Sequence, residues 1–484
     1  MRRCLIAALF LLTGSLAGAQ DLRKSVTWEN LRNHPAPLPV VGEIIPRPSN
    51  LNEPSLWSVG AETMDRDYAD FSKFRQYMKD TGVGYARLQS GWAKTEKKKG
   101  KYDFAWLDEH VNGLLEEGIH PWMCLCYGNP IYAERGDNPA DLNRSKLFAD
   151  GPVMDGWLRY VRTIVARYKG KVTLWEVWNE PDGPANKDAH DAYAHLFVRT
   201  AKAIREVDPE AKIAGFAACN PVKPFIRLGL KEIQRLGGLE YMDYLTYHSY
   251  YPIPEGAQRY IEELRKDVAA FSPHIKLLQG ETGCPAQLEY GHAMHSYEWT
   301  EYSQVKWDLR QALSHFGYGI PYSFFTMVDL NYGWMLQSYG LIRCNLQRTP
   351  VYKRPKYYGV QHVTSVFTPD LKADPAVHVE CDAQHKLTCF GVRNKNRAVG
   401  CLLWFSGNRP TSSLDRQLVN VRISGLRLSD PVYVDMVTGY VHEVAGLKDR
   451  LVGKGDGNIG FSDLPLWDGP ILLIERKALD YKPL

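Results

Sequence analysis

The stretch Trp175-Glu176-Val177-Trp178-Asn179-Glu180-Pro181 decides the fold, because an apolar run ends there in a polar tip closed by proline. Residues 171–177 have the pattern of a buried strand, which Pro181 prevents from continuing. A strand interior has no use for Asn179 and Glu180, since an unpaired buried carboxylate is costly or takes up a proton. We therefore expect the chemistry of the protein at this tip.

A second stretch of the same form runs from Ile275 to Pro285, with the sequence Ile-Lys-Leu-Leu-Gln-Gly-Glu-Thr-Gly-Cys-Pro. An apolar strand is followed by the carboxylate of Glu281, and then by glycine and proline, which force a turn. Two carboxylates at the ends of strands in one parallel sheet lie at the same edge of that sheet. The sequence thus predicts that Glu180 and Glu281 face each other.

Strand and helix patterns alternate from Trp57 to Phe367 and predict eight β-then-α units. We expect a closed (β/α)8 barrel at residues 56–368, in an α/β protein whose functional groups lie at the carboxyl ends of the strands. The alternative is an open doubly wound sheet, which is disfavoured because no glycine-rich phosphate-binding turn follows an early strand. The expected strands are 57–61, 85–88, 122–126, 171–177, 213–216, 244–247, 275–278 and 321–328.

Three other segments flank the expected barrel. Residues 369–484 show short alternating runs without helical period and predict a C-terminal all-β sandwich, which we interpret as a support for the barrel, with glycan binding as the alternative. Residues 20–55 are proline-rich and predict an irregular strap that adds a strand elsewhere. Residues 1–19 have two arginines, an apolar run and a small-residue cleavage site, so they predict a signal peptide and a secreted or periplasmic protein.

Composition excludes several classes of function. The formal net charge of +4 on 484 residues gives no electrostatic case for nucleic-acid binding. Beyond the signal peptide, no stretch reaches the length of a membrane span. Cys124 and Cys126 are expected to be core residues, whereas Cys381 and Cys389 flank a hairpin turn and leave a disulfide open.

The two strand-end glutamates resemble those of the retaining glycoside hydrolases called clan A, which carry an acid/base Glu preceded by Asn at the end of the fourth strand and a nucleophile Glu at the end of the seventh. Asn179-Glu180 and Glu281 match these places. The resemblance implies that Glu180 is the acid/base and Glu281 the nucleophile. The pattern is most similar to families 39 and 5.

The same resemblance assigns roles to residues around the two glutamates. Arg87, at the end of the second strand, matches an arginine that steadies the nucleophile. His248 and Tyr250, after the sixth strand, match a His-x-Tyr motif that orients the site. A salt bridge and a core histidine are the alternatives.

Aromatic and amide side chains near strand ends are candidates for binding sugar rings and hydroxyls. We expect Trp92, Trp334, Asn129 and Asn179 to bind substrate. Each aromatic ring has core packing as an equal alternative. Weaker candidates at strand ends are Tyr127, Trp178, Tyr251, Asp329, Glu62 and Asp65.

The sequence therefore predicts a glycosidase that cleaves β-glycosidic bonds in an oligosaccharide or polysaccharide with retention, without a cofactor or a metal. The main alternative is a non-catalytic carbohydrate-binding protein on the same scaffold. A metal-dependent hydrolase is disfavoured, because the histidines show no ligand-pair spacing. The sugar, the linkage, the choice between exo and endo action and the oligomeric state stay open.

Overall fold

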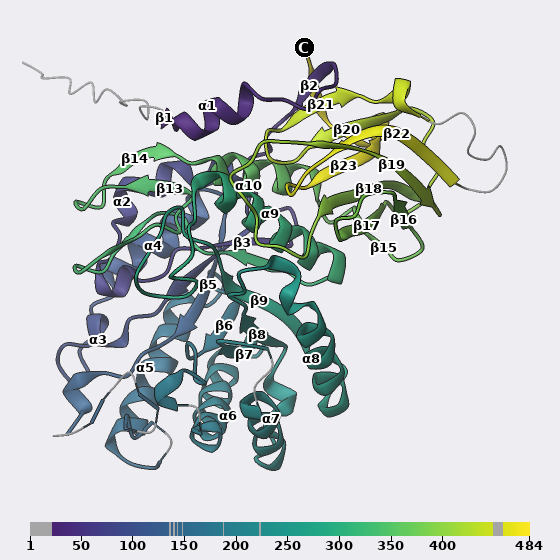
Figure 1. The fold of residues 1–484 in the computed structure, drawn as a ribbon. Helices are drawn as coiled ribbons and strands as arrows, with labels where there is room; N and C mark the ends of the chain where they lie inside the picture. The colour runs from purple at the N-terminus through teal and green to yellow at the C-terminus, as the bar shows by residue number, and fades with distance from the viewer. Residues whose placement is uncertain are drawn as a thin grey trace, which may run out of the picture.

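The computed structural model describes residues 22–134, 137–138, 141–142, 144–147, 149–186, 188–221, 224–448 and 458–484. The predicted signal peptide lies outside these residues. In the described part of the chain, the fold has a barrel surrounded by helices and a C-terminal region of antiparallel sheets (Figure 1). No described helix is both long and apolar enough to cross a membrane.

Eight parallel strands close into the barrel in the order β10-β3-β4-β5-β6-β7-β8-β9. The predicted (β/α)8 fold is therefore confirmed. The strands are buried on both faces, which accounts for their nearly continuous apolar sequences. They are β3 (Trp57–Gly60), β4 (Tyr85–Gln89), β5 (His120–Leu125), β6 (Leu174–Val177), β7 (Lys212–Ala218), β8 (Tyr244–His248), β9 (Lys276–Thr282) and β10 (Tyr322–Phe324).

Helices connect successive strands on the outside of the barrel (Figure 1). The helix expected after β3 is broken into α2 (Phe71–Phe74) and two 3-10 turns, Arg75–Tyr77 and Lys79–Thr81. The other helices are α3 (Trp92–Thr95), α4 (Ala105–Glu116), α5 (Pro152–Tyr168), α6 (His190–Val207), α7 (Pro224–Arg235), α8 (Gln258–Phe271), α9 (Glu301–Tyr318) and α10 (Pro355–Val366).

Between β10 and α10 the chain forms additional short strands on the rim of the barrel. A hairpin joins β11 (Leu330–Asn331) to β12 (Leu336–Gln337). Next, β13 (Ile342–Cys344) pairs with β14 (Pro350–Lys353), which also pairs in parallel with β1 (Arg23–Lys24). This excursion contributes Tyr332 and Gln337 to the wall of the candidate site.

The C-terminal region contains two antiparallel sheets, with strand orders β15-β17-β18-β23-β20-β21-β2-β24 and β16-β19-β22. The N-terminal segment contributes α1 (Val26–Arg32) and then β2 (Val40–Ile44), which pairs with β21 and β24. The remaining strands are β15 (Lys372–Asp374), β16 (His378–Cys381), β17 (Leu387–Arg393), β18 (Ala398–Phe405), β19 (Gln417–Ser424), β20 (Pro431–Asp435), β21 (Tyr440–Glu443), β22 (Asn458–Leu466), β23 (Ile471–Glu475) and β24 (Tyr481–Pro483).

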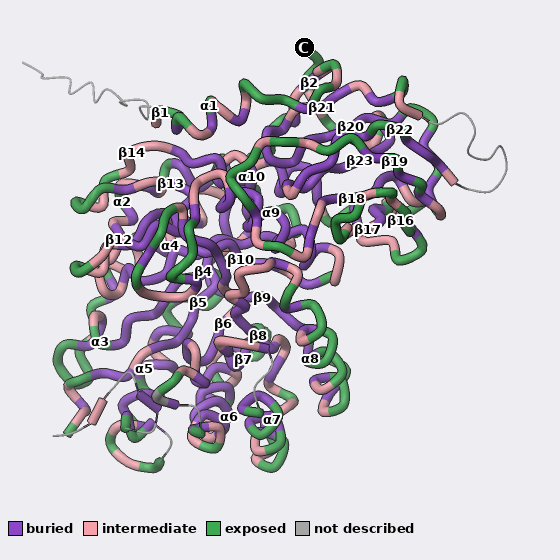
Figure 2. The backbone as a smooth tube through the Cα atoms, viewed as in Figure 1, coloured by how far each residue is buried: buried purple, intermediate pink, exposed green. Residues whose placement is uncertain are grey.

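Helix α9 joins the barrel to the C-terminal sheets. All of its residues from Ser303 to Phe316 are buried, as the tube in Figure 2 shows. The Lys306 ammonium donates to Asp468 at 2.6 Å, and Arg310, which is paired with Glu255 of the barrel, donates to the Asn408 carbonyl at 3.1 Å. These contacts support the interpretation that the sheets brace the barrel.

The cysteines form no disulfide in the described residues. Cys381 lies on β16, whereas Cys389 lies on β17 and pairs across to Leu403 of β18. These two residues thus belong to different sheets, and both thiols are free.

Candidate active site

The tip of β6 aims Asn179 and Glu180 into the barrel mouth. Trp178 and Glu180 have φ values of 70° and 49°, in the left-handed region that non-glycine residues rarely adopt. The backbone is held there, because Trp178 N–H donates to the Leu125 carbonyl at 3.0 Å and Glu180 N–H donates to the Ala217 carbonyl at 3.1 Å. The turn sends the Trp178 ring into the core and leaves the two polar side chains at the mouth.

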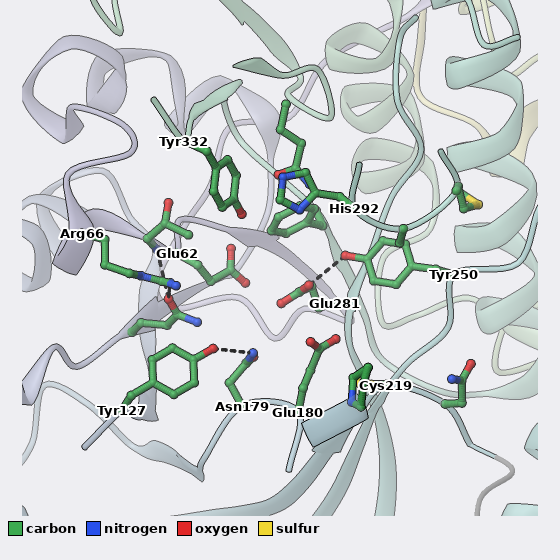
Figure 3. Close-up of a pocket in the computed structure, with 18 residues that line it drawn as sticks. Glu62, Arg66, Tyr127, Asn179, Glu180, Cys219, Tyr250, Glu281, His292 and Tyr332 are labelled. Atoms are coloured by element: carbon green, nitrogen blue, oxygen red, sulfur yellow. Dashed lines mark hydrogen bonds between the residues drawn. The ribbon is translucent and has the colours of Figure 1, made fainter. Parts of the chain in front are cut away.

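A pocket of about 640 Å³ opens at the carboxyl ends of the barrel strands (Figure 3). Both candidate catalytic glutamates line it, together with Asn179 and Tyr250. The other lining residues are Glu62, Thr63, Arg66, Gln89, Tyr127, Pro184, Cys219, Asn220, His292, Ala293, Met294, Phe325, Tyr332 and Gln337.

Arg87 organises the floor of this pocket. It is fully buried, and its Nε donates to Glu176 Oε2 at 2.8 Å. Its Nη1 contacts Glu62 Oε1 at 3.2 Å and Glu281 Oε2 at 2.8 Å, while Nη2 donates to Asn179 Oδ1 at 2.8 Å. Burial opposes the charge on Arg87, but the surrounding carboxylates outweigh burial and hold its pKa well above the usual value.

Glu281 is fixed through both of its carboxylate oxygens. Besides the bond from Arg87 to Oε2, the Tyr250 hydroxyl donates to Oε1 at 2.8 Å. Together these two hydrogen bonds hold the carboxylate in a single orientation. Only 13% of the Glu281 side chain is exposed, and Glu281 lines the pocket, so a substrate would reach its carboxylate from the pocket.

His248 links the two glutamates. Its Nδ1 lies 3.0 Å from Glu180 Oε1 and 3.8 Å from Glu281 Oε1. Burial lowers the pKa of His248, yet the two carboxylates outweigh burial, and the net result is a raised pKa. One ligand-type atom from each of the three residues lies within 4.8 Å of the others, which places the two carboxyl groups face to face.

The same three side chains could in principle hold a metal ion. Their present partners argue against this use. Glu281 already accepts hydrogen bonds on both oxygens, one of them from a guanidinium whose charge would repel a cation. The donor set therefore suits two paired carboxyl groups better than a metal.

Glu62 is a third carboxyl group on the pocket floor, beside Glu281 (Figure 3). Burial raises the pKa of Glu62 to about 7; Arg87 opposes this rise and Glu281 adds to it. The Oε2 atom of Glu62 has no hydrogen-bond partner among the described residues. This oxygen lies against Gly60, where any larger residue would collide with it. Glu62 therefore gains or loses its proton near neutral pH beside the candidate nucleophile.

Three predicted substrate-binding residues, Trp92, Asn129 and Trp334, lie away from this pocket. The predictions for Trp92 and Asn129 are wrong. Trp92 is completely buried and donates to Glu96 at 2.5 Å, so it cannot stack on a sugar. The Asn129 amide donates to the backbone carbonyls of Trp92 and Glu96, which makes it a loop brace. Trp334 is 68% exposed and lies outside the pocket lining, behind His292.

Among the weaker candidates, Tyr127 and Glu62 line the pocket, while Trp178 is buried in the core. Asp329 is also buried and makes an ion pair with Arg354 at 2.5 Å. It therefore supports the rim strands and does not bind hydroxyl groups. Asp65 forms an ion pair with Arg66 at 3.3 Å, and Tyr251 packs against Tyr260.

Sequence reasoning missed several wall residues. Gln89 is the last residue of β4 and Cys219 directly follows β7, so their strand-end positions are a usable signal. His292 and Tyr332 come from long rim segments, which the strand pattern does not place. Arg66, which lies over the Tyr127 ring, comes from the irregular segment after β3.

Comparisons with known proteins agree with this architecture. Residues 64–277 match the model of glycosyl hydrolases family 39, a range that includes Glu180 and ends four residues before Glu281. A stretch of 119 residues is 34% identical to "Beta-galactosidase BbgII" of Bifidobacterium bifidum and covers 21% of this chain and 17% of that protein. The aligned part is thus about a sixth of that relative's length.

Solved structures share the fold. A family 39 glycoside hydrolase from the gut symbiont Bacteroides cellulosilyticus WH2 superposes with a TM-score of 0.62 at 16% identity, covering 90% of this chain and 82% of that one. A GH30 endoxylanase from Clostridium papyrosolvens C71 gives 0.55 at 13% identity, with coverage of 90% and 97%. The partial sequence matches are thus to glycoside hydrolases, and the solved structures show a shared fold.

Proposed function

We propose that this protein is a secreted or periplasmic glycosidase that cleaves β-glycosidic bonds with retention, with Glu180 as acid/base and Glu281 as nucleophile. The observation that carries the proposal is the pair of opposed carboxyl groups: one oxygen of Glu180 and one of Glu281 lie within 4.8 Å of each other and of a ring nitrogen of His248. Retaining glycosidases hold their carboxyl groups about 5 to 5.5 Å apart, whereas inverting enzymes need about 6.5 to 9.5 Å to admit a water molecule.

In the first step, Glu180 gives a proton to the oxygen of the leaving group while Glu281 attacks the sugar carbon and forms a glycosyl ester. Arg87 and Tyr250 orient Glu281 for this attack. His248 contacts Glu180 at 3.0 Å and orients the acid. In the second step, Glu180 takes a proton from water, and the water oxygen displaces Glu281 from the sugar.

Asn179 has an orientation suited to binding the reacting sugar. Its Oδ1 accepts from Arg87 at 2.8 Å, and its Nδ2 donates to the Tyr127 hydroxyl at 2.9 Å. An amide nitrogen carries two hydrogens. The second hydrogen of Asn179 can therefore donate to a sugar hydroxyl in the pocket.

The proposed substrate is an oligosaccharide or polysaccharide. One relative is named a β-galactosidase and one structural neighbour an endoxylanase, so the two names point to different sugars. Localisation outside the cytoplasm rests on the predicted signal peptide at residues 1–19.

The test is a screen against aryl β-xyloside, mannoside, galactoside, glucoside and glucuronide. Proton NMR of the first-formed sugar should show the β-anomer from a β-glycoside. An initial α-anomer would contradict retention. Inactivity on all five substrates together with intact glycan binding would instead support a non-catalytic carbohydrate-binding protein.

A further inference from the structure

A second hollow of about 610 Å³ lies on the rim beside the catalytic pocket, and we call it the rim groove. It is lined by residues 287–290 of the loop after β9, residues 334–336 of the β11–β12 hairpin, and Arg343, Asn345 and Leu346. A neighbouring hollow of about 470 Å³ shares Gln287, Arg343 and Asn345 with it, so the depression continues past β13 towards Tyr352.

The rim groove gathers exposed apolar side chains. Tyr290 is 87% exposed and Trp334 is 68% exposed, and Leu288 and Leu346 accompany them. These are four of the ten large hydrophobic residues that stand out as exposed in the described chain. Apolar surface concentrated in this way commonly marks a binding site.

The groove adjoins the catalytic pocket. The Trp334 ring stacks on His292, with centroids 5.4 Å apart and an interplanar angle of 24°, and His292 in turn lines the pocket. Tyr332 also lines the pocket and packs against His292 at 4.4 Å. A row of aromatic rings therefore leads from the reacting centre to the rim groove.

The position of this row identifies which part of a substrate would reach the groove. His292 and Tyr332 lie across Glu281 from Glu180 (Figure 3). Under the proposed function, Glu180 protonates the leaving group, so the leaving group lies on the Glu180 side. The part of the chain that passes His292 is then the part that stays bonded to Glu281.

The chemistry of the groove suits a sugar chain. Aromatic faces stack on the apolar faces of pyranose rings, and the Arg343 guanidinium and Asn345 amide offer hydrogen bonds to hydroxyl groups beside them. We propose, on the basis of the proposed function, that the rim groove binds sugar units of an oligosaccharide on the non-reducing side of the cleaved bond. The protein then releases fragments longer than one sugar from that side.

The test compares the protein with Tyr290→Ala and Trp334→Ala on an aryl monoglycoside chosen by the screen and on the β-linked pentasaccharide of the same sugar. Aromatic contacts worth about 0.5 to 1.5 kcal/mol correspond to about 2- to 12-fold in affinity. Each variant should lower the pentasaccharide-to-monoglycoside ratio of kcat/KM by that factor, mainly through KM. Leu418→Ala, which truncates an exposed residue on β19, is the matched control and should keep the ratio.

An unchanged ratio in both variants would overturn the proposal, and it is the outcome expected of a groove that serves a protein partner. Release of single sugars alone from the non-reducing end would overturn it as well. Calorimetry of pentasaccharide binding separates the rim-groove proposal from the proposed glycosidase activity, because binding does not require turnover. If the screen finds no activity, weaker binding by Tyr290→Ala would still support the groove, and equal binding would refute it.

Discussion

Removal of Glu180 should affect substrates according to their leaving groups. General acid catalysis contributes about 10²- to 10⁴-fold, which is about 2.7 to 5.4 kcal/mol at 1.36 kcal/mol per tenfold. The Glu180→Ala variant should cleave a glycoside whose leaving alcohol needs a proton more slowly by this full factor. A dinitrophenyl glycoside has a leaving group that departs without protonation, so the rate of its bond-breaking step should fall much less.

The structure limits other effects of this change. The Glu180 side chain is 36% exposed, so its truncation opens no buried cavity, and the hydrogen bond to His248 is the main contact that disappears. Such a contact is worth about 1.5 to 3 kcal/mol at most, and its loss acts equally on both substrates. The difference between the two substrates therefore reports acid catalysis alone.

The assay measures kcat/KM on both glycosides, with exposed Glu298→Gln as a control carboxylate in the nearby loop. Azide added to Glu180→Ala should intercept the glycosyl-enzyme and give the β-glycosyl azide. Equal losses on the two substrates, or an α-azide, would refute the assignment of Glu180.

The remaining predictions concern Glu281, Arg87, Glu62 and His362. Glu281→Gly should abolish turnover of all substrates together and give the α-glycosyl azide on azide addition; near-normal turnover would contradict its role. Arg87→Met should lower the free energy of unfolding by about 3 to 5 kcal/mol in urea titrations, because it leaves buried carboxylates uncompensated, and a loss below about 1 kcal/mol would count against the network. Since burial raises the pKa of Glu62 from 4.5 to about 7, the free energy of unfolding should fall as pH rises through this interval, by at most about 1.4 kcal/mol per pH unit, and Glu62→Gln should remove that slope. Burial also lowers the pKa of His362 from 6.5 to about 4, so its contribution to stability is present above pH 6.5 and should be lost as pH falls towards 4; circular dichroism of His362→Gln should show a weaker acid dependence.

The sequence predicted the barrel and the opposed glutamates because both depend on local patterns. Apolar strands buried on two faces have continuous hydrophobic runs, and a carboxylate at the end of such a run has few structural uses. Glu180 and Glu281 were found in this way. Strands of the C-terminal sheets such as β21 are harder to find, since Tyr440–Glu443 is short and mixes polar with apolar residues.

The walls of the pocket were less predictable for a physical reason. Trp92 and Asn129 follow strand ends, as true ligands do, but both are buried. The Trp92 ring packs against Tyr132 and Trp157, and the Asn129 amide donates to backbone carbonyls of the loop after β4. His292 and Tyr332 reach the pocket through tertiary packing of two rim segments that are distant in sequence. Periodicity describes single elements, so it does not carry this information.

The all-round burial of α9 also bears on how this protein can be divided. A cut at residue 368 follows the change of sequence pattern, yet it would expose one face of α9, the next helix along the chain after the strand that carries Glu281. Lys306 would then be left without Asp468, and the Arg310–Glu255 pair would lose the cover of Trp404, whose indole donates to Glu255 at 2.7 Å. We therefore expect the barrel and the C-terminal sheets to unfold together, and a barrel cut at residue 368 to be less stable than the same barrel in the full chain.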